Sequence, residues 1–272
     1  MDNKRYGKRK EEYRKNDNNV NRHPTEYEIN ENIVSGRNAV KELLGSGRDV
    51  EKIYIQKGER EGSVNLLIGI ASERKIQIIE ADRRKLDELS GGERHQGIVA
   101  IASERNYSTI DDIFAYAEER GEKPFILLLD GVEDPHNLGA IIRSAECSGV
   151  HGVIIPKRRA VGLTSTVAKA SAGAIEYMRV AKVTNLAQTI DELKERGVWI
   201  YGADMGGTSY YETDMNSSIC IVMGSEGFGI SRLVKEKCDF IVSIPLFGRV
   251  NSMNVSCAAA VIMADAARQR KV

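Results

Sequence analysis

FILLLDGVEDPHNLGAIIRSAEC, residues 125–147, is the stretch that decides the fold of the second half of the chain. Its first five residues, Phe125 to Leu129, are all apolar and suit a strand that is covered on both faces, as in a parallel sheet. A polar loop follows, and from Leu138 onward apolar residues recur at the spacing of a helix with one buried face. Asn137, just before that helix, suits its N-cap. A strand, a loop and an amphipathic helix form the repeating unit of an α/β domain.

The alternation of strand and helix continues to the end of the chain. Apolar periodicity predicts helices at 138–148, 165–172, 186–196, 231–237 and 254–268, and strands at 152–155, 178–183, 198–203, 219–223 and 241–244. This alternation predicts an α/β domain over residues 125–272, with a mostly parallel sheet and helices on both faces. Because ligands bind outside the carboxyl ends of the strands in such sheets, the loops after Leu129, Met223 and Ile244 form the candidate site.

Arg143 lies off the apolar stripe of the first helix. Helical side chains lean toward the N-terminus, so Arg143 is expected to extend over the small Gly139 toward Asn137 and to point at a ligand. The alternative is an exposed helix arginine that pairs with Glu146 or Asp134.

The second and third loops contain residue types that suit ligand binding or helix capping. GSEGFGI, residues 224–230, contains glycines that allow close approach of the backbone to a ligand. It is not the G-x-G-x-x-G fingerprint, and Glu226 disfavours a phosphate, so the loop fits a neutral or cationic ligand. In the third loop, residues 244–256, Ser252 can cap the next helix, and both Ser252 and Asn254 serve either as capping groups only or as site residues.

The first half of the chain is expected to hold a smaller α/β domain, residues 30–104. Helices are predicted at 38–44, 64–74 and 83–89, and strands at 50–55, 76–80 and 97–101. Residues 105–124 hold charged and polar positions and an amphipathic turn or two around residues 110–117, and they are expected to connect the two domains. Residues 1–28 hold too few apolar side chains to fold and are interpreted as a disordered basic and polar tail, with a basic arm that touches RNA phosphates as the alternative.

Composition narrows the class of protein. Among 272 residues, 39 lysines and arginines balance 39 aspartates and glutamates, so RNA binding would need a local basic patch. No apolar run reaches the roughly 18 residues of a membrane helix, and the first residues lack the apolar stretch of a secretory signal, so we expect a cytoplasmic protein with no membrane span. The cysteines, Cys147, Cys220, Cys238 and Cys257, form no C-x-x-C pair, so we expect buried thiols and no metal site.

Three segments carry a resemblance to a known family. DPHNLGAIIRSA (134–145), MGSEGFGI (223–230) and IPLFGRVNSMNVS (244–256) resemble motifs one, two and three of the SpoU/TrmH RNA 2'-O-methyltransferases, in that order. Met253 stands where leucine is usual and Cys257 where valine is common. Both are apolar exchanges and weaken the resemblance little.

The first half is similar to the small RNA-binding domain of the RlmB branch of this family, which methylates a guanosine ribose in 23S rRNA. The similarity covers residues 33–103 and includes SGRNAV at 35–40 and HQGI at 95–98. It implies 23S rRNA as the partner, either as naked RNA or within a ribosomal assembly intermediate. Methylation of tRNA or of another rRNA site, and RNA binding without catalysis, are the alternatives.

The resemblance also implies a trefoil knot in the C-terminal sheet, S-adenosylmethionine bound in the knot, and a homodimer formed through the knotted domains. The implied cofactor-binding residues are Gly224, Ser225, Ile244, Leu246, Met253 and Asn254. The implied catalytic residues are Asn137, Arg143, Glu226, Ser252 and Asn254. Among the cofactor-binding residues, Gly224, Ile244 and Met253 would act largely through backbone groups, and Leu246 would pack near the adenine.

The resemblance implies Arg143 as the base that acts on the ribose hydroxyl. A guanidinium has a pKa above about 12 and stays protonated, which makes it a poor base. In the alternative role, Arg143 binds the substrate phosphate in bidentate fashion and stabilises charge on the 2'-oxygen. Methyl transfer from a sulfonium would then depend mainly on alignment.

Other cations are candidates for RNA binding. Lys157, Arg158 and Arg159 follow a predicted strand, and Arg249 lies in the third loop; all four either neutralise phosphates or belong to solvated loops. In the small domain, Arg37 and Asn38 either read an unpaired RNA segment or begin and cap a helix.

Overall fold

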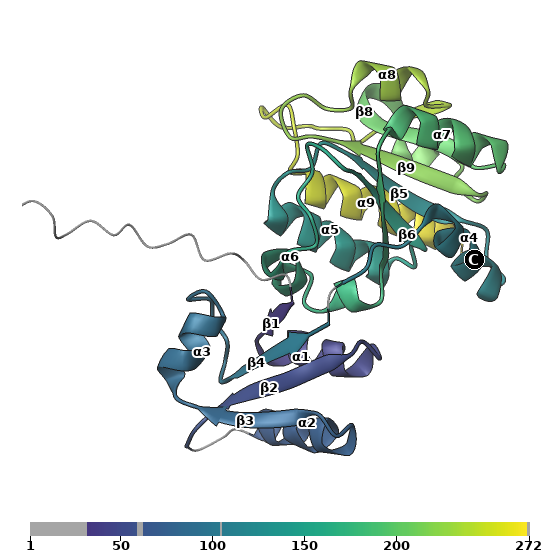
Figure 1. Ribbon diagram of the computed structural model, residues 1–272. Helices are drawn as coiled ribbons and strands as arrows, with labels where there is room; N and C mark the ends of the chain where they lie inside the picture. Colours follow the sequence, from purple (N-terminus) through teal and green to yellow (C-terminus); the bar gives the residue numbers. More distant parts are fainter. Residues whose placement is uncertain (1–31, 59–61, 104, 271–272) are drawn as a thin grey trace, which may run out of the picture.

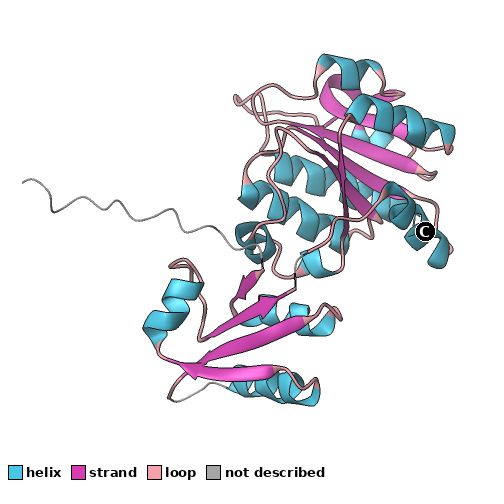
Figure 2. Cartoon of the chain, in the orientation of Figure 1, coloured by secondary structure: helices cyan, strands magenta, loops and turns pink. Residues whose placement is uncertain are grey.

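The protein, seen in a computed structural model, has two α/β domains (Figures 1 and 2). The structure describes residues 32–58, 62–103 and 105–270. The predicted tail, residues 1–28, lies outside the described residues. In Figure 1 the small N-terminal domain lies below the large C-terminal one.

The small domain is built on a mixed four-stranded sheet. Its elements are β1 (Ile33–Ser35), α1 (Arg37–Gly45), β2 (Val50–Gln56), α2 (Gly62–Glu73), β3 (Gln77–Ala81), α3 (Arg83–Leu89) and β4 (Ile98–Ala102). The strand order is β1-β4-β2-β3, with only β2 and β3 parallel. Leu43 of α1 and Leu67 of α2 pack with Ile53 and Ile98 of the sheet in one core. The predicted helices and strands are confirmed, and β1 is an addition to them.

The large domain is built on a six-stranded sheet in the order β10-β8-β9-β5-β6-β7, in which all neighbouring strands are parallel. Its strands are β5 (Phe125–Asp130), β6 (Gly152–Pro156), β7 (Arg179–Val183), β8 (Trp199–Ser209), β9 (Ile219–Gly224) and β10 (Phe240–Ser243). Its helices are α4 (Ile110–Glu119), α5 (Pro135–Cys147), α6 (Ser165–Ala170), α7 (Leu186–Glu195), α8 (Arg232–Glu236) and α9 (Val255–Arg270), with the short η2 (Ala174–Glu176) and η3 (Tyr210–Glu212). The predicted parallel sheet is confirmed.

β8 runs well beyond its predicted end at residue 203, as far as Ser209. The glycines at 206 and 207 weaken the strand pattern in the sequence. In the structure they serve close packing, because a Cβ on Gly207 would lie 2.2 Å from the carbonyl oxygen of Ile241 in β10. The neighbouring strand therefore requires glycine at this point.

Helices cover both faces of the large sheet (Figure 2). Alternate residues of β5 divide between two cores. Leu127 and Leu129 pack with α5, α6 and α9, whereas Ile126 and Leu128 pack with α4, α7 and α8. This arrangement confirms the predicted fold class, and the trefoil knot stays a prediction.

Part of the predicted connection belongs to the large domain. Thr109 caps α4, and Ile113 of α4 is fully buried in the core formed with β5 and β6. A Cβ on Gly152 of β6 would lie 2.4 Å from Ile113 Cδ1, so the helix fits closely on the sheet. The amphipathic turns expected around residues 110–117 thus form a full helix, α4, which packs on the large sheet.

His151 is a buried titratable residue close to α4. Its Nδ1 accepts a hydrogen bond from the backbone N–H of Phe125 at 2.9 Å, and its Nε2 lies 3.1 Å from Glu122 Oε2. The backbone donor fixes Nδ1 as an acceptor, so the neutral ring carries its proton on Nε2. Burial lowers the pKa of His151 below its usual value.

We expect the protein to lose stability as the pH falls from about 7 to about 5. An unfolded histidine binds a proton near pH 6.5, whereas the lowered pKa of His151 opposes protonation in the folded protein, so acid favours the unfolded state. His151→Gln removes this contribution, and its urea midpoint should vary less with pH than that of the wild type. The same pH dependence in both proteins would contradict this account.

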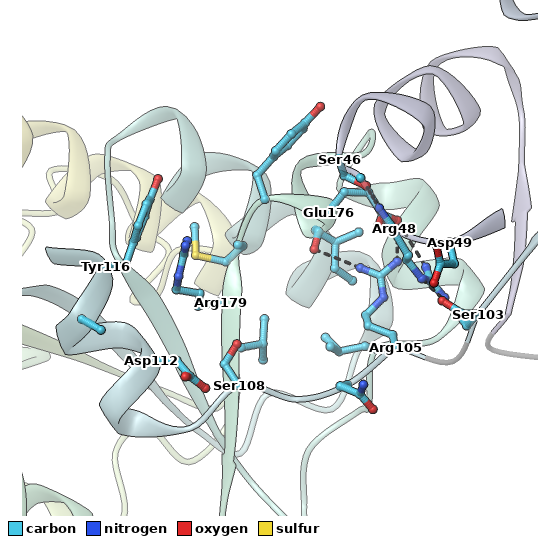
Figure 3. A pocket seen from close by; sticks show the side chains of 18 of the residues that line it. Ser46, Arg48, Asp49, Ser103, Arg105, Ser108, Asp112, Tyr116, Glu176 and Arg179 are labelled. Atoms are coloured by element: carbon cyan, nitrogen blue, oxygen red, sulfur yellow. Dashed lines mark hydrogen bonds and ion pairs between the residues drawn. The ribbon is translucent and has the colours of Figure 1, made fainter. Parts of the chain in front are cut away.

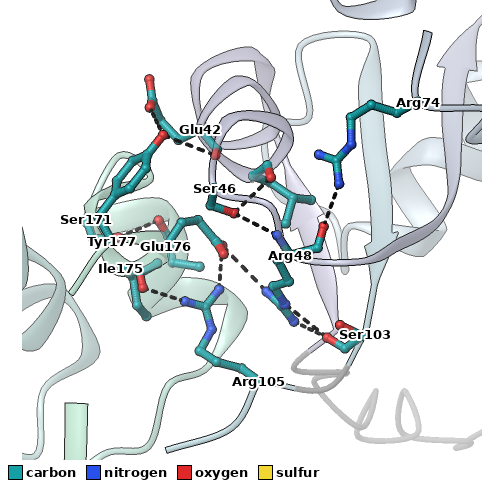
Figure 4. Close-up of polar contacts among 12 residues, drawn as sticks. Glu42, Ser46, Arg48, Arg74, Ser103, Arg105, Ser171, Ile175, Glu176 and Tyr177 are labelled. Atoms are coloured by element: carbon teal, nitrogen blue, oxygen red, sulfur yellow. Dashed lines mark hydrogen bonds and ion pairs between the residues drawn. The ribbon is translucent and has the colours of Figure 1, made fainter. Parts of the chain in front are cut away.

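A buried ionic cluster joins the two domains (Figures 3 and 4). The carboxylate of Glu176 in η2 accepts from Arg48 of the small domain at 3.5 Å and from Arg105 of the connection at 2.5 Å. The three side chains are only 3%, 11% and 9% exposed, in that order. Arg48 also donates to the carbonyl of Ser103. The cluster therefore connects the small domain, the connection and the large domain through one carboxylate.

Further close contacts between the two domains surround the ionic cluster. The hydroxyl of Tyr177 donates to the Glu42 carboxylate at 2.9 Å (Figure 4), and Lys169 pairs with Glu93 at 3.2 Å. A Cβ on Gly173 would lie 2.3 Å from Glu42 Cβ, so α1 approaches this turn more closely than a side chain would allow. These contacts dock the small domain against α6 and η2.

Candidate active site

The three predicted loops meet at the carboxyl edge of the large sheet. Asn137 of α5 donates its side-chain N–H to Glu226 Oε1 at 2.7 Å. Asn254, just before α9, donates to the same oxygen at 2.9 Å and to Asn137 Oδ1 at 3.0 Å. These bonds connect the loops after β5, β9 and β10, and they hold the Glu226 carboxylate as an acceptor between two amides. We call these three residues the polar trio.

Asp134, and not Asn137, caps α5. Asp134 Oδ1 accepts from the backbone N–H groups of His136 at 2.7 Å and Asn137 at 2.9 Å, and Pro135 opens the helix. The prediction of Asn137 as the cap is wrong because the helix begins at Pro135. The side chain of Asn137 is consequently free to join the polar trio.

Asn254, and not Ser252, caps α9. Asn254 Oδ1 accepts from the backbone N–H groups of Ser256 at 2.9 Å and Cys257 at 3.2 Å. The predicted capping role of Ser252 is wrong because α9 begins at Val255. The oxygen of Asn254 therefore caps the helix while its nitrogen joins the polar trio, and its role in the site stays a prediction.

The second loop is closed by its own backbone. Ser225 N–H donates to the carbonyl of Gly229 at 3.1 Å, and Gly229 N–H donates back to the carbonyl of Ser225 at 3.0 Å. A Cβ on Gly224 would lie 2.1 Å from the carbonyl carbon of Gly229, so no other residue fits there. The tight closure presents Glu226 and Phe228 at the tip of the loop.

A cavity of about 600 Å³ lies between the second and third loops; we call it the first cavity. All six residues predicted to bind the cofactor line it: Gly224, Ser225, Ile244, Leu246, Met253 and Asn254. Its wall combines apolar side chains, such as Met223 and Ile262, with the carboxylates of Asp204 and Glu226. An apolar wall suits an adenine, carboxylates suit a cation, and the volume lies in the range of cofactor sites. The residues present therefore fit S-adenosylmethionine.

A second cavity, of about 480 Å³, lies between the first and second loops. Asn137 and Glu226 line it, and Glu226 and Phe228 line both cavities. At its edge, Asp130 Oδ2 accepts from Ser231 N–H at 2.8 Å and ties the two loops together. The two cavities are therefore neighbours that share the second loop: of the polar trio, Glu226 lines both, Asn254 the first and Asn137 the second.

Arg143 is exposed on α5 and lines neither cavity. Its side chain forms no hydrogen bond or ion pair within residues 32–58, 62–103 and 105–270, so the predicted alternative of pairing with Glu146 or Asp134 is wrong. The space at Gly139 is not room for Arg143, because a Cβ there would lie 2.4 Å from Ala170 Cβ on α6. Gly139 lets α5 pack closely on α6, while Arg143 is an exposed cation without a hydrogen-bond or ion-pair partner among the described residues.

The candidate RNA-binding cations divide into two groups. Lys157, Arg158, Arg159 and Arg249 are exposed around the three loops, and their side chains have no ion-pair partner in the described part of the chain. In the small domain Asn38 is exposed, whereas Arg37 donates to the carbonyl of Gln96 at 3.1 Å and to Ser63 Oγ at 3.2 Å. α1 begins at Arg37 with Gly36 as its N-cap, so neither candidate caps the helix.

Sequence reasoning did not single out Phe228, the ring of which is 96% exposed. A large aromatic residue among the glycines of a predicted site loop is the signal that could have found it. Asp130 and Glu133 of the second cavity were also missed, because acidic loop residues are common on any protein surface.

Other features of the molecule are poorer candidates for chemistry. A cavity of about 720 Å³ lies at the domain junction (Figure 3), but Glu176 engages Arg48 and Arg105 there. Among the described residues, no group of His, Cys, Asp and Glu is placed to hold a metal ion, and no helix is long and apolar enough to span a membrane. Cys220 is buried, but the prediction of buried thiols is wrong for Cys147 and Cys257, which are exposed on the outer sides of α5 and α9.

Comparisons with known proteins agree with this division of the chain. A sequence model of the SpoU rRNA Methylase family matches residues 124–264, and one described as RNA 2'-O ribose methyltransferase substrate binding matches residues 33–108. The chain is 48% identical over 238 residues to the Putative TrmH family tRNA/rRNA methyltransferase YacO of Bacillus subtilis (strain 168), covering 87% of this chain and 95% of that protein. A Putative TrmH family tRNA/rRNA methyltransferase of Staphylococcus haemolyticus (strain JCSC1435) is 47% identical, over 88% and 96% of the two chains.

Solved structures show the same fold. The SpoU methyltransferase AviRb from Streptomyces viridochromogenes, in complex with the cofactor AdoMet, has a TM-score of 0.72 at 24% identity and covers 88% of this chain and 90% of its own. A structure named RNA 2'-O ribose methyltransferase has a TM-score of 0.73 at 23% identity, over 88% and 89% of the two chains.

Proposed function

The chain belongs to the SpoU rRNA methylase family, and we propose that it transfers a methyl group from S-adenosylmethionine to the ribose 2'-hydroxyl of a guanosine in 23S rRNA. The observation that carries the proposal is the polar trio, which three separate loops hold at the boundary of two cavities. One cavity fits the cofactor, and the other leaves space for a nucleotide beside it.

In the proposed mechanism the cofactor supplies an electrophilic methyl group on a sulfonium. Backbone groups of Gly224, Ile244 and Met253, which line the first cavity, would hold it, and Leu246 would pack near its adenine. The carboxylate of Glu226 favours a cationic ligand in a cavity that excludes much of the water. Because the polar trio fixes this carboxylate, the cofactor and the substrate meet at a preorganised boundary.

The remaining site residues act on the RNA in this proposal. Asn137 and Asn254 hold the boundary between the cavities, and Ser252 lies exposed at the mouth of the first cavity. Arg143 lines neither cavity of its own chain, so in this proposal it reaches the site of the second copy in a homodimer. There it binds a substrate phosphate and stabilises negative charge on the 2'-oxygen as the hydroxyl proton passes to water, since a guanidinium stays protonated. Lys157, Arg158 and Arg249 bind flanking phosphates, and Arg37 and Asn38 contact RNA from the small domain.

We further propose that the protein acts as a homodimer through the large domain. α5 and α9 pack side by side (Figure 1), and their outer surfaces carry small residues, among them Ser144, Cys147, Cys257 and Ala264. Small side chains let the helices of a second copy approach closely, and a two-fold axis there would bring two copies of Arg143 to one interface. Ala264→Arg should convert the dimer to a monomer in sedimentation equilibrium, and an unchanged mass would contradict this interface.

The test of the function is a map of ribose 2'-O-methylation across rRNA and tRNA in cells with and without the protein. We expect one guanosine of 23S rRNA to lose its methyl group and to regain it when a cytoplasmic copy of the protein is supplied. Naked 23S rRNA and assembly intermediates of the large ribosomal subunit, incubated with tritiated S-adenosylmethionine, would show which form is the substrate. Loss of methylation at a tRNA position instead would make this a tRNA enzyme, and an unchanged map would overturn the proposal.

A further inference from the structure

The second cavity differs chemically from the first. Carboxylates of Asp130, Glu133, Asp134 and Glu226 line it, and Arg159 is its only lysine or arginine among the described residues. Asp130 and Asp134 accept hydrogen bonds from backbone N–H groups, and Glu226 accepts from side-chain amides. Glu133, by contrast, is exposed and forms no ion pair in the described residues. The carboxylate part of this wall repels a phosphate but accepts hydrogen bonds from the N–H groups of a base, which leaves Arg159 as the place for a phosphate.

Phe228 is the aromatic surface of this cavity. Its ring is 96% exposed although it lines both cavities, so it offers a face to whatever enters either of them. Phe247 in the third loop is 95% exposed but lines neither cavity. Exposed aromatic rings beside a substrate cavity are the surfaces on which unpaired bases stack.

Arg159 is the cation of this cavity. Its side chain is exposed and has no ion-pair partner among the described residues, and its backbone adopts a φ of 56°, a left-handed conformation that is unfavourable for a non-glycine residue. Arg159 lines the second cavity together with residues of the first and second loops. An uncommitted guanidinium in this place suits a phosphate in bidentate fashion.

We propose that the second cavity receives the target nucleotide in unpaired form, with its base stacked on Phe228 and its phosphate bound by Arg159. The inference rests on the proposed function, because a target ribose must lie beside the cofactor and the polar trio. Guanine suits the cavity best, since its adjacent N1–H and N2–H groups match the free carboxylate of Glu133. Base pairing would hide both the face and the edge of the base, so the protein should act on unpaired RNA.

The test compares Phe228→Ala with the matched control Phe247→Ala, which removes an equally exposed ring outside the cavities. The kcat/KM for an in vitro transcript of 23S rRNA is measured at saturating S-adenosylmethionine, because Phe228 also lines the first cavity. We expect Phe228→Ala to lower kcat/KM by roughly 5- to 150-fold, the usual range for one lost stacking contact. Phe228→Tyr should restore most of the activity, Phe228→Leu should not, and Phe247→Ala should change it little.

Arg159→Gln gives an independent readout through salt. Losing one contact to a single-stranded phosphate should reduce the slope of log K against log salt by about 0.7. Phe228→Ala should weaken binding of the labelled transcript without changing this slope. Glu133→Gln should lower kcat/KM for the guanosine target.

Three results would overturn the inference. Phe228→Ala and Phe247→Ala could weaken RNA binding equally, Arg159→Gln could leave the salt slope unchanged, or Phe228→Ala could dissociate a dimer without affecting RNA binding. If the wild type binds RNA through Phe228 but transfers no methyl group to the transcript or to assembly intermediates of the large ribosomal subunit, the proposed function fails and the binding site stands. If the wild type binds no RNA, both fail.

Discussion

Arg143→Ala lowers the rate of methyl transfer by roughly 10²- to 10³-fold, the usual effect of removing one group that stabilises charge in a transition state. The side chain is exposed and forms no hydrogen bond or ion pair in the described residues, so its loss should leave the melting temperature unchanged. Because Arg143 does not line the first cavity, the affinity for S-adenosylmethionine in calorimetry should also be unchanged. The substitution should therefore lower the rate of methyl transfer itself and leave folding and cofactor binding unchanged.

Two further variants sharpen this prediction. Arg143→Lys keeps the charge but loses the planar fork, so it should recover only part of the rate if bidentate phosphate binding matters. Arg232→Ala is the matched control, because Arg232 is an exposed arginine on α8 that lines neither cavity. An Arg143→Ala protein with the rate of the wild type would remove Arg143 from both of its alternative roles.

Glu176→Gln should release the small domain from the large one. Neutralising this carboxylate leaves Arg48 and Arg105, which are 11% and 9% exposed, buried without a counter-charge. Breaking a buried ion pair in this way typically costs about 3–5 kcal/mol. Because each domain has its own core, undocking relieves the cost without global unfolding. The radius of gyration in small-angle scattering should rise, and trypsin should cut faster near Arg105.

Glu176→Gln should affect the use of RNA but not the binding of the cofactor. Cofactor affinity should stay unchanged because the first cavity lies wholly in the large domain, whereas kcat/KM for RNA should fall as the two RNA-binding surfaces lose their fixed spacing. Glu192→Gln removes a carboxylate from a more exposed pair with Arg196 and should cost less than about 1 kcal/mol. An unchanged radius of gyration for Glu176→Gln would show that the ionic cluster does not hold the domains together.

The order of helices and strands was predictable because apolar periodicity is local. The ends of elements were less so: Asn137 and Asn254 both precede or begin apolar helical patterns, yet only Asn254 is a cap, since Asp134 and Pro135 start α5 earlier. The approach of the three loops was predictable because parallel strands place their carboxyl ends along one edge. The hydrogen bonds of the polar trio were not, since they depend on side-chain positions set by all three loops.

The domain junction lay beyond sequence reasoning. Arg48 and Glu176 are 128 positions apart, and nothing in the surroundings of either residue indicates a buried partner. Gly139 shows a related difficulty, because its small size could equally have served Arg143 or a neighbouring helix, and only the position of α6 decides between them.

The burial of α4 determines where the chain can be cut. A recombinant fragment that starts at Phe125 would lack α4 and its buried Ile113, so the apolar side chains of β5 and β6 that Ile113 covers would be exposed to solvent. Such a fragment should aggregate during expression, even though the methylase match begins at residue 124. A fragment that begins before Tyr107 keeps Thr109 and the whole of α4, and it should purify without aggregating.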